Sequence, residues 1–527
     1  MASPASVEVD VVVVGAGLSG LSAAYELTKR DPSLRVAVLE AKDRVGGRTL
    51  TTTLKAAGGE DVWDLGGQWV GRTQVHIMAL LQELGLEVYS QYNKGKKYMK
   101  LGNNKIKTYV SDIPTLPIWA LLDLHFFLKK IDHMSTKVPI EDPYKCQYAE
   151  EWDSVTVEDF KQEHCWTKAA MEAIDCAVLV MFGVDCSQIS LLYFLAYNNA
   201  AGGIKALTES SEGAGQEFKV KGGTQQISQL LAEKVGKQNI YLNNPVMTVT
   251  QDDTQVLITT TTGDVFRCSR AIFTTMPQQT ASVQFNPSLP LEKLELFKRM
   301  PAGCIVKFII TYQNTFWRDA GFSGEIVTCG RTKTGEDGPL GVVFDATSPN
   351  GNPALVGFVA AKQAVKWSCD EASKRKAAVL SGIAEFLGPQ AEECLDYVEQ
   401  NWGEEPYTLG GPVSPATTGC MAYFTAGLRQ PFNRIHFGGT ESATVWCGFM
   451  NGAVQAGTRT AIEVLYHLRP QAVATEELRQ SAYCPASTWP QKKRKVKRHK
   501  ILKWTLGFGV LTCLALVARR TYIKYID

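Results

Sequence analysis

Residues 11–49 read VVVVGAGLSGLSAAYELTKRDPSLRVAVLEAKDRVGGRT. The four valines are typical of a strand buried in a parallel sheet. The spacing G-x-G-x-x-G follows at once, then a helical stretch over about 18–29 and an apolar strand over 34–39 that ends at Glu40. This order of strand, glycines, helix, strand and acid predicts a dinucleotide-binding unit, and an ordinary strand-to-helix turn is the alternative.

The three glycines and the acid have separate physical roles. Gly15 permits the tight turn, Gly17 lets backbone approach a pyrophosphate, and Gly20 lets the helix pack close to the sheet. The first helical turn, which includes Ser19, offers N–H groups and a positive dipole end to the phosphates. The carboxylate of Glu40 can accept hydrogen bonds from both hydroxyls of an adenosine ribose.

The segment after the acid distinguishes between dinucleotides. Arg44 and Arg48 can bind phosphate oxygens through charge-assisted hydrogen bonds, and the glycines between them allow backbone close to a ligand. The whole run, EAKDRVGGRT over 40–49, resembles the second phosphate-binding signature of flavin-containing amine oxidases. This resemblance favours FAD over NAD as the cofactor.

Composition excludes several other classes. The net charge of +2 gives no electrostatic argument for a nucleic-acid partner. The 13 cysteines are scattered without a C-x-x-C pair, which argues against a disulfide framework or a structural zinc site. No metal site is predicted, and the N-terminus shows neither a signal peptide nor a transit peptide.

Length and pattern predict two or three domains in the 527 residues. The expected fold class is α/β: a Rossmann-like FAD-binding domain in three chain segments, an inserted α+β substrate domain, and a C-terminal transmembrane helix. The predicted FAD-binding segments are 1–87, 215–300 and 402–470. The predicted substrate-domain segments are a mainly helical one, 88–214, and a sheet with a helix, 301–401; 471–500 is expected to be a linker with a basic run.

The C-terminal segment has the pattern of a membrane anchor. A basic run over 492–500 precedes an apolar stretch over 504–518 that would span roughly 22 Å as a helix. Lys503 and its neighbours can snorkel to extend it toward the ~30 Å hydrocarbon core. We predict a tail-anchor helix over 501–520. A buried terminal helix and a nuclear localisation signal are the alternatives.

Motifs spread along the chain together resemble the monoamine oxidases, flavin enzymes of the mitochondrial outer membrane. The motifs are EAKDRVGGRT, DLGGQWVG (64–71), CWTK (165–168), NWGEEPY (401–407), FGGTES (437–442) and WCGFMNGAVQAG (446–457). The resemblance implies a single-pass tail anchor with the enzyme on the cytoplasmic face of that membrane. The endoplasmic reticulum is the alternative location.

The resemblance also implies roles for particular residues. Lys307, Phe449 and Trp402 take catalytic roles, the lysine by holding a water against flavin N5. Gln216, Phe358, Val413 and Phe449 contact the substrate. The expected cofactor-binding residues are Gly15, Gly17, Ser19, Gly20, Glu40, Ala41, Arg44, Gly47, Arg48, Gly66, Gly67, Gln68, Trp69, Val246, Gly439, Glu441 and Met450.

Two positions depart from the family pattern. The family attaches its flavin through a cysteine in a Gly-Gly-Cys-Tyr run, and the matching run here, 410–413, has Pro412 in that place. Because proline has no thiol, we predict non-covalent FAD, with Cys420 as the remaining nearby candidate. The two tyrosines that normally flank the amine are matched by Val413 (Pro412 if no gap is counted) and Phe449, so the aromatic cage loses one wall.

The predicted activity is oxidative deamination of a monoamine to an aldehyde, ammonia and hydrogen peroxide, with dioxygen as the oxidant. A polyamine or amino-acid oxidase is one alternative, and a membrane-anchored flavoprotein that binds amines with little turnover is another. The expected partners are a small amine, dioxygen and a lipid bilayer, without nucleic acid, and a homodimer is one option for its assembly.

Overall fold

The computed structural model describes residues 6–102, 105–110, 114–330 and 338–480. These residues belong to one compact unit, Met1–Tyr483, and residues 484–527 lie outside the described part of the chain. In the described part of the chain, no helix combines the length and apolarity that crossing a bilayer requires. The predicted tail anchor, 501–520, is not among these residues.

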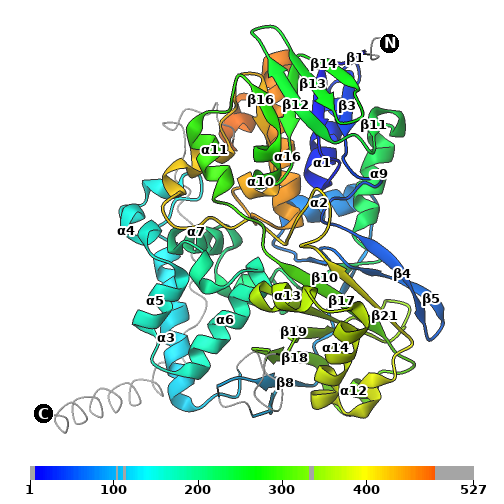
Figure 1. The fold of residues 1–527 in the computed structure, drawn as a ribbon, viewed down its shortest axis with the longest axis vertical. Coiled ribbons are helices and arrows are strands. Elements are labelled where there is room, and N and C mark those ends of the chain that lie inside the picture. Colours follow the sequence, from blue (N-terminus) through cyan, green and yellow to red (C-terminus); the bar gives the residue numbers. More distant parts are fainter. Residues whose placement is uncertain (1–5, 103–104, 111–113, 331–337, 481–527) are drawn as a thin grey trace, which may run out of the picture. The chain divides into compact units, whose positions relative to one another are not determined.

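A parallel five-stranded sheet forms the centre of the nucleotide-binding half (Figure 1). Its order is β11 (Ile240–Tyr241), β3 (Val36–Leu39), β2 (Val11–Val14), β15 (Arg270–Phe273) and β22 (Ile435–Phe437). A second sheet packs on one face of it: β1 (Ser6–Glu8), β14 (Val265–Cys268), β13 (Val256–Thr260), β12 (Val246–Gln251) and β16 (Gln284–Asn286). The strands therefore come from three distant chain segments, as a fold with an inserted domain requires.

The uninterrupted valines of β2 are explained by cover on both faces of the sheet. Val11 and Val13 pack in a core with helices, whereas Val12 and Val14 pack in the core shared with the second sheet. Successive strand residues point to opposite faces, so a strand covered on both sides is apolar at every position. All four valines are at most 5% exposed.

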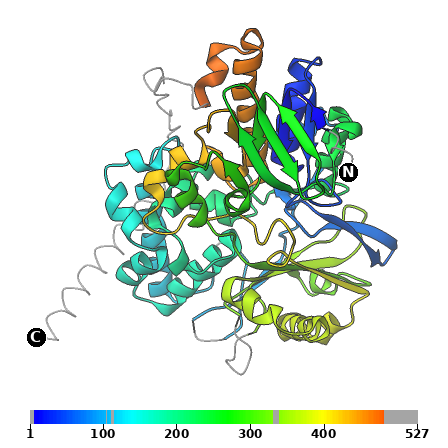
Figure 2. The ribbon, with the colours of Figure 1, turned by 45° about the horizontal axis from the view of Figure 1, so that its top comes forward.

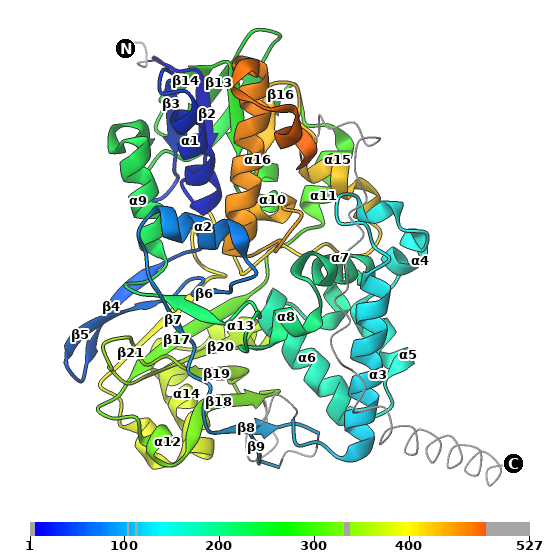
Figure 3. The same ribbon diagram turned by 180° about the vertical axis from the view of Figure 1, so that it is seen from behind.

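Helices α1 (Leu18–Arg30) and α16 (Met450–Leu468) lie side by side on the helical face (Figure 3). A Cβ at Gly457 would lie 2.1 Å from the carbonyl oxygen of Ser19, which explains how closely the two helices approach. The other helices of this half are α2 (Val75–Glu83), α9 (Gln225–Val235), α10 (Pro277–Ser282), α11 (Leu291–Lys298) and α15 (Phe424–Leu428).

A mixed seven-stranded sheet is the floor of the substrate half. Its order is β21 (Asp396–Asn401), β17 (Ile305–Thr311), β20 (Ala354–Ala360), β19 (Val342–Asp345), β18 (Phe322–Thr328), β8 (Lys96–Lys100) and β9 (Lys107–Tyr109). Figure 2 shows helices α13 (Ala361–Ser368) and α14 (Ala372–Leu387), in yellow-green, beside this sheet. The short helix α12 (Phe316–Asp319) precedes β18.

Alternation along β17 decides which side chains face the functional cavity. Val306, Phe308 and Ile310 pack in the core that contains the buried residues of α14. Lys307 has the opposite orientation and sits opposite Phe358 on β20. The sheet register thus brings two predicted site residues together.

The remaining elements are a bundle of helices, a small sheet and a hairpin. Helices α3 (Ile118–Ser135), α4 (Ala149–Ser154), α5 (Val157–His164), α6 (Lys168–Phe182), α7 (Leu191–Ala201) and α8 (Ile204–Thr208) form a bundle. Strands β6 (Trp69–Val70), β10 (Phe218–Val220) and β7 (Val88–Ser90) form a small sheet, and β4 (Thr51–Ala56) pairs with β5 (Gly59–Asp64). The segment predicted as mainly helical, 88–214, thus begins with three strands, because β7 and β8 pair with the distant strands β10 and β18, and β9 pairs with β8. Short 3-10 turns lie at Pro143–Lys145, Cys186–Gln188, Lys237–Asn239, Pro389–Glu392, Met421–Tyr423, Thr440–Ser442, Pro470–Ala472 and Thr475–Gln480.

Candidate active site

A cavity of about 440 Å³ runs from the nucleotide-binding sheet to the floor of the substrate half. At one end it is lined by Val14, Leu39 and Thr274, which lie at or just beyond the carboxyl ends of β2, β3 and β15. This is the edge at which open parallel sheets bind their ligands. At the other end it reaches Ile305 and Lys307 of β17.

The first helical turn at the cavity is uncapped by side chains. Gly17 is the N-cap of α1, no side chain caps it, and no acidic residue lies in the first turn. Gly17 forms an isolated parallel bridge with Gly46, so two glycine-rich segments meet at this point. Gly15 has φ +101°, and a Cβ at Gly20 would lie 1.9 Å from the carbonyl oxygen of Gly15. The backbone thus presents a donor-rich surface that side chains would block, which fits a pyrophosphate.

Glu40 is held in place by two backbone donors. Its Oε2 accepts from the N–H of Ala16 at 2.7 Å, and its Oε1 accepts from the N–H of Lys42 at 3.0 Å. Burial raises the pKa of this carboxyl, and the two N–H donors and the charges of Lys42 and Arg44 oppose that rise. Glu40 lines the cavity directly beyond the carboxyl end of β3, so its carboxylate is available to a ribose as the sequence pattern predicts.

The two arginines of the second motif have different positions. Arg48 lines the cavity, and its Nη1 donates to Glu441 at 2.6 Å and to the carbonyl of Pro412 at 2.9 Å. Arg44 does not line it; its guanidinium donates to the carbonyls of Thr49 and Gly47 within its own loop. Arg44 therefore shapes the phosphate loop rather than reaching into the cavity.

Lys307 is the buried cation of the site. Its Nζ donates to the carbonyl of Gly66 at 2.8 Å and to Oε1 of Gln68 at 2.7 Å. Burial lowers the pKa of Lys307 to about 7, against an attractive effect of Asp64 and with a further lowering by Lys219. Near neutral pH this side chain can thus either hold or release a proton.

Aromatic rings form the walls around this lysine. Trp69 and Phe358 have ring centroids 6.0 Å apart, and Trp402 donates its indole N–H to the carbonyl of Leu65 at 3.0 Å. On the helical side, the rings of Tyr197 and Phe449 are 6.1 Å apart with a 35° tilt. All five residues line the cavity, which therefore has an apolar chamber at its substrate end.

Most of the sequence-predicted site residues meet at this one cavity. Those that line it are Gly15, Gly17, Ser19, Glu40, Ala41, Gly47, Arg48, Gly66, Gly67, Gln68, Trp69, Gln216, Val246, Lys307, Phe358, Trp402, Phe449 and Met450. Those that do not are Gly20, Arg44, Val413, Gly439 and Glu441. Gly20 supports the turn and Glu441 holds Arg48.

Val413, predicted to contact the substrate, does not line the cavity. Its side chain is fully buried in the core beside Gly448, and Pro412 takes its place at the cavity wall. This placement agrees with the alignment without a gap, in which Pro412 rather than Val413 matches the family's tyrosine. A shift of one residue in an extended segment turns a side chain to the opposite side, and sequence alone could not settle the register.

Several lining residues were missed by sequence reasoning. Tyr197 comes from helix α7 within an aromatic run, where nothing distinguishes a core ring from a cavity ring. Thr274, Thr275 and Met276 directly follow β15. The signal for these three was present, because residues just after a buried parallel strand lie at the ligand-binding edge.

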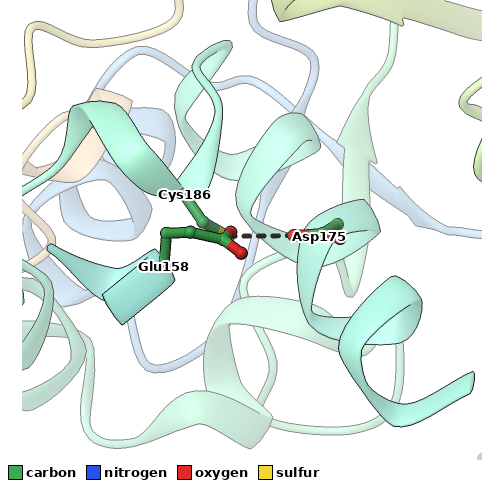
Figure 4. A group of neighbouring side chains, drawn as sticks. All are labelled: Glu158, Asp175 and Cys186. Carbon is green, nitrogen blue, oxygen red and sulfur yellow. Dashed lines mark hydrogen bonds between the residues drawn. The ribbon is translucent and has the colours of Figure 1, made fainter. Parts of the chain in front are cut away.

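Figure 4 shows a separate group of potential metal ligands, Glu158, Asp175 and Cys186. The thiol of Cys186 donates to Oδ1 of Asp175 at 3.2 Å. The ammonium of Lys161 bonds the same Asp175 oxygen and lies 2.6 Å from Glu158 Oε2. Because the buried ammonium of Lys161 already pairs with both carboxylates, this group is explained as an ion-pair cluster.

The fold and the cavity define a flavin-dependent oxidoreductase: a dinucleotide cradle continues into an apolar chamber beside a buried lysine. The sequence profile described as "Flavin containing amine oxidoreductase" matches residues 18–465. The chain belongs to this family, so its cofactor is FAD and it is an amine-oxidising enzyme.

Individual relatives agree with this assignment. The chain is 36% identical over 461 residues to "Amine oxidase [flavin-containing] A" of Canis lupus familiaris, covering 86% of this chain and 85% of the relative. It is 35% identical over 462 residues to "Amine oxidase [flavin-containing] B" of Homo sapiens, covering 87% and 86%. It is 35% identical over 458 residues to a probable flavin-containing monoamine oxidase A of Dictyostelium discoideum, covering 86% and 97%.

Solved structures show the same fold. Putrescine oxidase bound to putrescine superposes with a TM-score of 0.81 at 29% identity, covering 88% of this chain and 100% of that one. Cyclohexylamine oxidase from Brevibacterium oxydans IH-35A superposes with a TM-score of 0.81 at 29% identity, and the match covers 87% of this chain and 99% of that one.

Proposed function

We propose that this enzyme oxidises primary monoamines with an apolar or aryl side chain, and that it holds its FAD without a covalent bond. The proposed substrate class is supported by the residues that line the cavity. Among the described residues that line it, Glu40 is the single carboxylate, and it lies at the ribose end. A polyamine needs acidic partners for its distal ammonium groups, and an α-amino acid needs a cation for its carboxylate. The cations among the described lining residues already have partners: Lys42 pairs with Glu405, Arg48 pairs with Glu441, and Lys307 donates to Gly66 and Gln68.

The substrate end of the cavity favours a neutral amine. Val180, Met181, Leu207, Phe358 and Phe449 line it, and they offer little solvation to a charged group. Gln216 donates its Nε2 to the carbonyl of Leu207 at 3.3 Å, which orients its amide oxygen for other donors. We infer that this oxygen can receive an amine N–H.

The FAD supplies the redox chemistry when bound, accepting two electrons from the amine and passing them to dioxygen. The protein residues position and solvate the reaction. The uncapped start of α1 and Glu40 hold the dinucleotide, the rings of Tyr197 and Phe449 orient the amine, and the apolar walls limit water. Lys307 holds a proton at its Nζ on the floor of the same cavity.

The test of turnover is hydrogen peroxide release from the purified full-length enzyme. Arylalkyl and alkyl monoamines should release peroxide together with an aldehyde, whereas spermidine, putrescine and amino acids should give at least about tenfold lower kcat/KM. A flavin that stays oxidised under anaerobic monoamine would contradict oxidation and would favour an amine-binding flavoprotein. Faster turnover of putrescine than of benzylamine would overturn the proposed substrate class.

The proposal of non-covalent attachment is supported by the positions of the cysteine thiols in the described residues. None of the described residues that line the cavity is a cysteine. Cys420 is fully buried, its thiol donates to the carbonyl of Thr417 at 3.0 Å, and burial raises its pKa to about 12. A protonated thiol outside the cavity is not placed to bond to a flavin.

Acid precipitation should leave the yellow flavin in the supernatant and a colourless pellet. The matching control is a Pro412→Cys variant, which places a thiol at the family position on the cavity wall. Colour that stays in the wild-type pellet, with a flavin peptide found by mass spectrometry, would refute non-covalent binding and identify the attachment residue.

We also propose that the C-terminal segment binds a lipid bilayer, in the mitochondrial outer membrane. The support is the sequence: an apolar stretch over 504–518 next to a run of lysines and arginines. The full chain should sediment with membranes and resist carbonate extraction, whereas a chain truncated after residue 490 should stay in the supernatant. Cell fractionation then distinguishes the mitochondrial outer membrane from the endoplasmic reticulum.

A further inference from the structure

The loop that follows β21 forms part of the wall of the flavin cavity, and we call its residues 404–409 the strap. Tyr407 and Thr408 of the strap line the cavity together with Lys42, which lies two residues after Glu40. The strap therefore borders the end of the cavity at which the adenosine half of a dinucleotide is expected.

The two ends of the strap are fixed to the protein by backbone hydrogen bonds. Before the strap, the N–H of Trp402 donates to a carbonyl of β17 at 3.0 Å; after it, the N–H of Gly411 donates to a carbonyl just before β17 at 2.8 Å. Between these ends, the backbone hydrogen bonds of the described chain are local. The N–H groups of Thr408 and Leu409 both donate to the carbonyl of Glu405, at 3.2 and 2.8 Å.

Another wall at the same end of the cavity is attached more firmly. The N–H of Asn243 donates to the carbonyl of Lys42 at 2.9 Å, and the N–H of Asn244 donates to the carbonyl of Glu40 at 2.8 Å. Asn244 and Val246 line the cavity, and Val246 begins strand β12. This wall is thus held by backbone bonds and by a sheet, whereas the strap can move without disrupting either.

Side chains hold the middle of the strap in place, chiefly at one carboxylate. Oε1 of Glu405 accepts from the Nζ of Lys42 at 2.7 Å and from Nη2 of Arg44 at 2.8 Å. Its Oε2 accepts from Nε2 of Gln400 at 2.9 Å. The Nζ of Lys42 also donates to Oγ1 of Thr408 at 2.7 Å. Lys42 is therefore joined to the strap at two points.

The ion pair at Glu405 is largely shielded from solvent. The side chains of Lys42 and Glu405 are 9% and 15% exposed, so salt screens their attraction weakly. Burial raises the pKa of the Glu405 carboxyl, but the hydrogen bonds and charges of Lys42 and Arg44 bring this pKa below its ordinary value. Glu405 is not among the residues that line the cavity. The carboxylate therefore acts on the strap and not on a ligand in the cavity.

The backbone of the strap contains two unfavourable torsions. Tyr407 and Leu409 have φ +59° and +51°, in the left-handed region that bulky residues seldom adopt. Such torsions persist where the surrounding structure holds them. The two residues are 51% and 54% exposed and gain little packing in return. The side-chain hydrogen bonds of Glu405 and Thr408 therefore hold the strap against its own backbone preference.

We propose that the strap is the gate through which FAD enters and leaves the cavity, and that Glu405 is its latch. Lys42 and Thr408 both line the cavity and bond to each other, so their hydrogen bond closes the cavity edge two residues from Glu40. Release of Glu405 frees the middle of the strap while its ends stay in place. The inference rests on the proposed function, because only a flavin without a covalent bond can leave.

A latch and a cofactor contact differ in their kinetic effects. Loss of a contact raises the dissociation rate and the Kd together, whereas a looser gate raises the association and dissociation rates by similar factors. Glu405→Gln keeps the size of the side chain and removes its charge. In this variant, bound FAD should exchange with isotope-labelled FAD about tenfold faster than in the wild-type holoenzyme, and the Kd should change less than about threefold.

Both rates are measured on the full-length protein. Dissociation is followed by mass spectrometry of the flavin that stays bound after a chase with labelled FAD. Association is followed by quenching of FAD fluorescence after stopped-flow mixing with flavin-depleted protein. The matched control is Glu404→Gln, which removes the exposed carboxylate beside the latch and should leave both rates at their wild-type values.

A second variant should slow the exchange. Asparagine adopts the left-handed conformation more readily than leucine, so Leu409→Asn should stabilise the strap in place and slow both rates about two- to threefold. Leu409 is not among the cavity-lining residues, so the substitution changes no contact with the cofactor. Slower exchange also cannot result from partial unfolding. Exchange in Leu409→Asn that is as fast as in Glu405→Gln would contradict the gate.

Hydrogen–deuterium exchange gives a readout that is independent of turnover. The amides of Thr408 and Leu409, which bond to the Glu405 carbonyl, should exchange several-fold faster in Glu405→Gln than in wild type. The amides of the neighbouring strand β21 should be unchanged. Equal exchange of the strap amides in the two proteins would show that Glu405 does not hold the strap.

The outcomes separate this inference from the proposed function. Flavin that stays in the acid-precipitated pellet of the wild type would refute non-covalent binding and the gate together. Flavin that acid releases, but that exchanges in Glu405→Gln at the wild-type rate, would leave the proposed function intact and overturn the gate. Faster dissociation with unchanged association would also overturn it, because Glu405 would then support the bound cofactor and not the strap.

Discussion

The Glu40→Ala enzyme is expected to purify without its flavin. Without this carboxylate the ribose hydroxyls lose their hydrogen-bond acceptors. The loss should cost on the order of 3 kcal/mol of binding free energy, which raises the Kd for FAD more than a hundredfold. The backbone N–H groups of Ala16 and Lys42 also lose their common partner. The measurement is the ratio of absorbance at 450 and 280 nm in the purified protein, with FAD affinity of the apoprotein from fluorescence titration.

Two further variants separate binding from folding. Glu40→Gln keeps one acceptor oxygen and should retain flavin at an intermediate affinity. Glu60→Ala, an exposed position on β5, should bind flavin as wild type does. A Glu40→Ala protein that is fully yellow would refute the assigned role. A protein that lacks native far-UV circular dichroism even with excess FAD would show that the residue acts through folding instead.

The Lys307→Met enzyme is expected to reoxidise its reduced flavin about a hundredfold more slowly than wild type. Methionine keeps the length of the side chain and removes the amine that donates to Gly66 and Gln68. Reduction by a monoamine should change much less, because the amine end of the cavity is lined by apolar side chains. Stopped-flow measurement of flavin reduction and of flavin reoxidation tests this expectation. An equal decrease in the two rates would contradict it.

Stability measurements give this variant a second signature. The pKa of Lys307 is about 7 in the folded protein and 10.5 in its ordinary state. Between these values the unfolded chain binds more protons, so the contribution of Lys307 to stability rises with pH through that interval. The Met variant should lose this rise. Tm measured at pH 6.5 and pH 9, compared between the variant and wild type, tests the sign.

Sequence reasoning succeeded where the physics is local. A strand, a glycine turn and an acid lie within 30 residues, so Gly15, Gly17 and Glu40 could be assigned to one binding task from their spacing. The structure then placed these residues on the wall of a single cavity. Lys307 was found from the resemblance, supported by the oddness of a lysine within an apolar strand.

Sequence reasoning could not decide the direction of a side chain where a shift of one residue reverses it. Pro412 and Val413 are neighbours, yet one lines the cavity and the other is packed beside Gly448. Arg44, predicted to bind the phosphates, donates to carbonyls of its own loop and does not line the cavity. In both cases the direction of a side chain depends on backbone torsions that adjacent residues do not dictate.

By itself, the amino-acid sequence determined the class of the cofactor and the order of the segments that bind it. These depend on short patterns whose turn and hydrogen-bonding requirements act within a few residues. Only the tertiary structure decided what stands next to Lys307: Gln68, 239 positions away. The pKa of Lys307 follows from burial and from charges on other strands, and no local pattern encodes such distances.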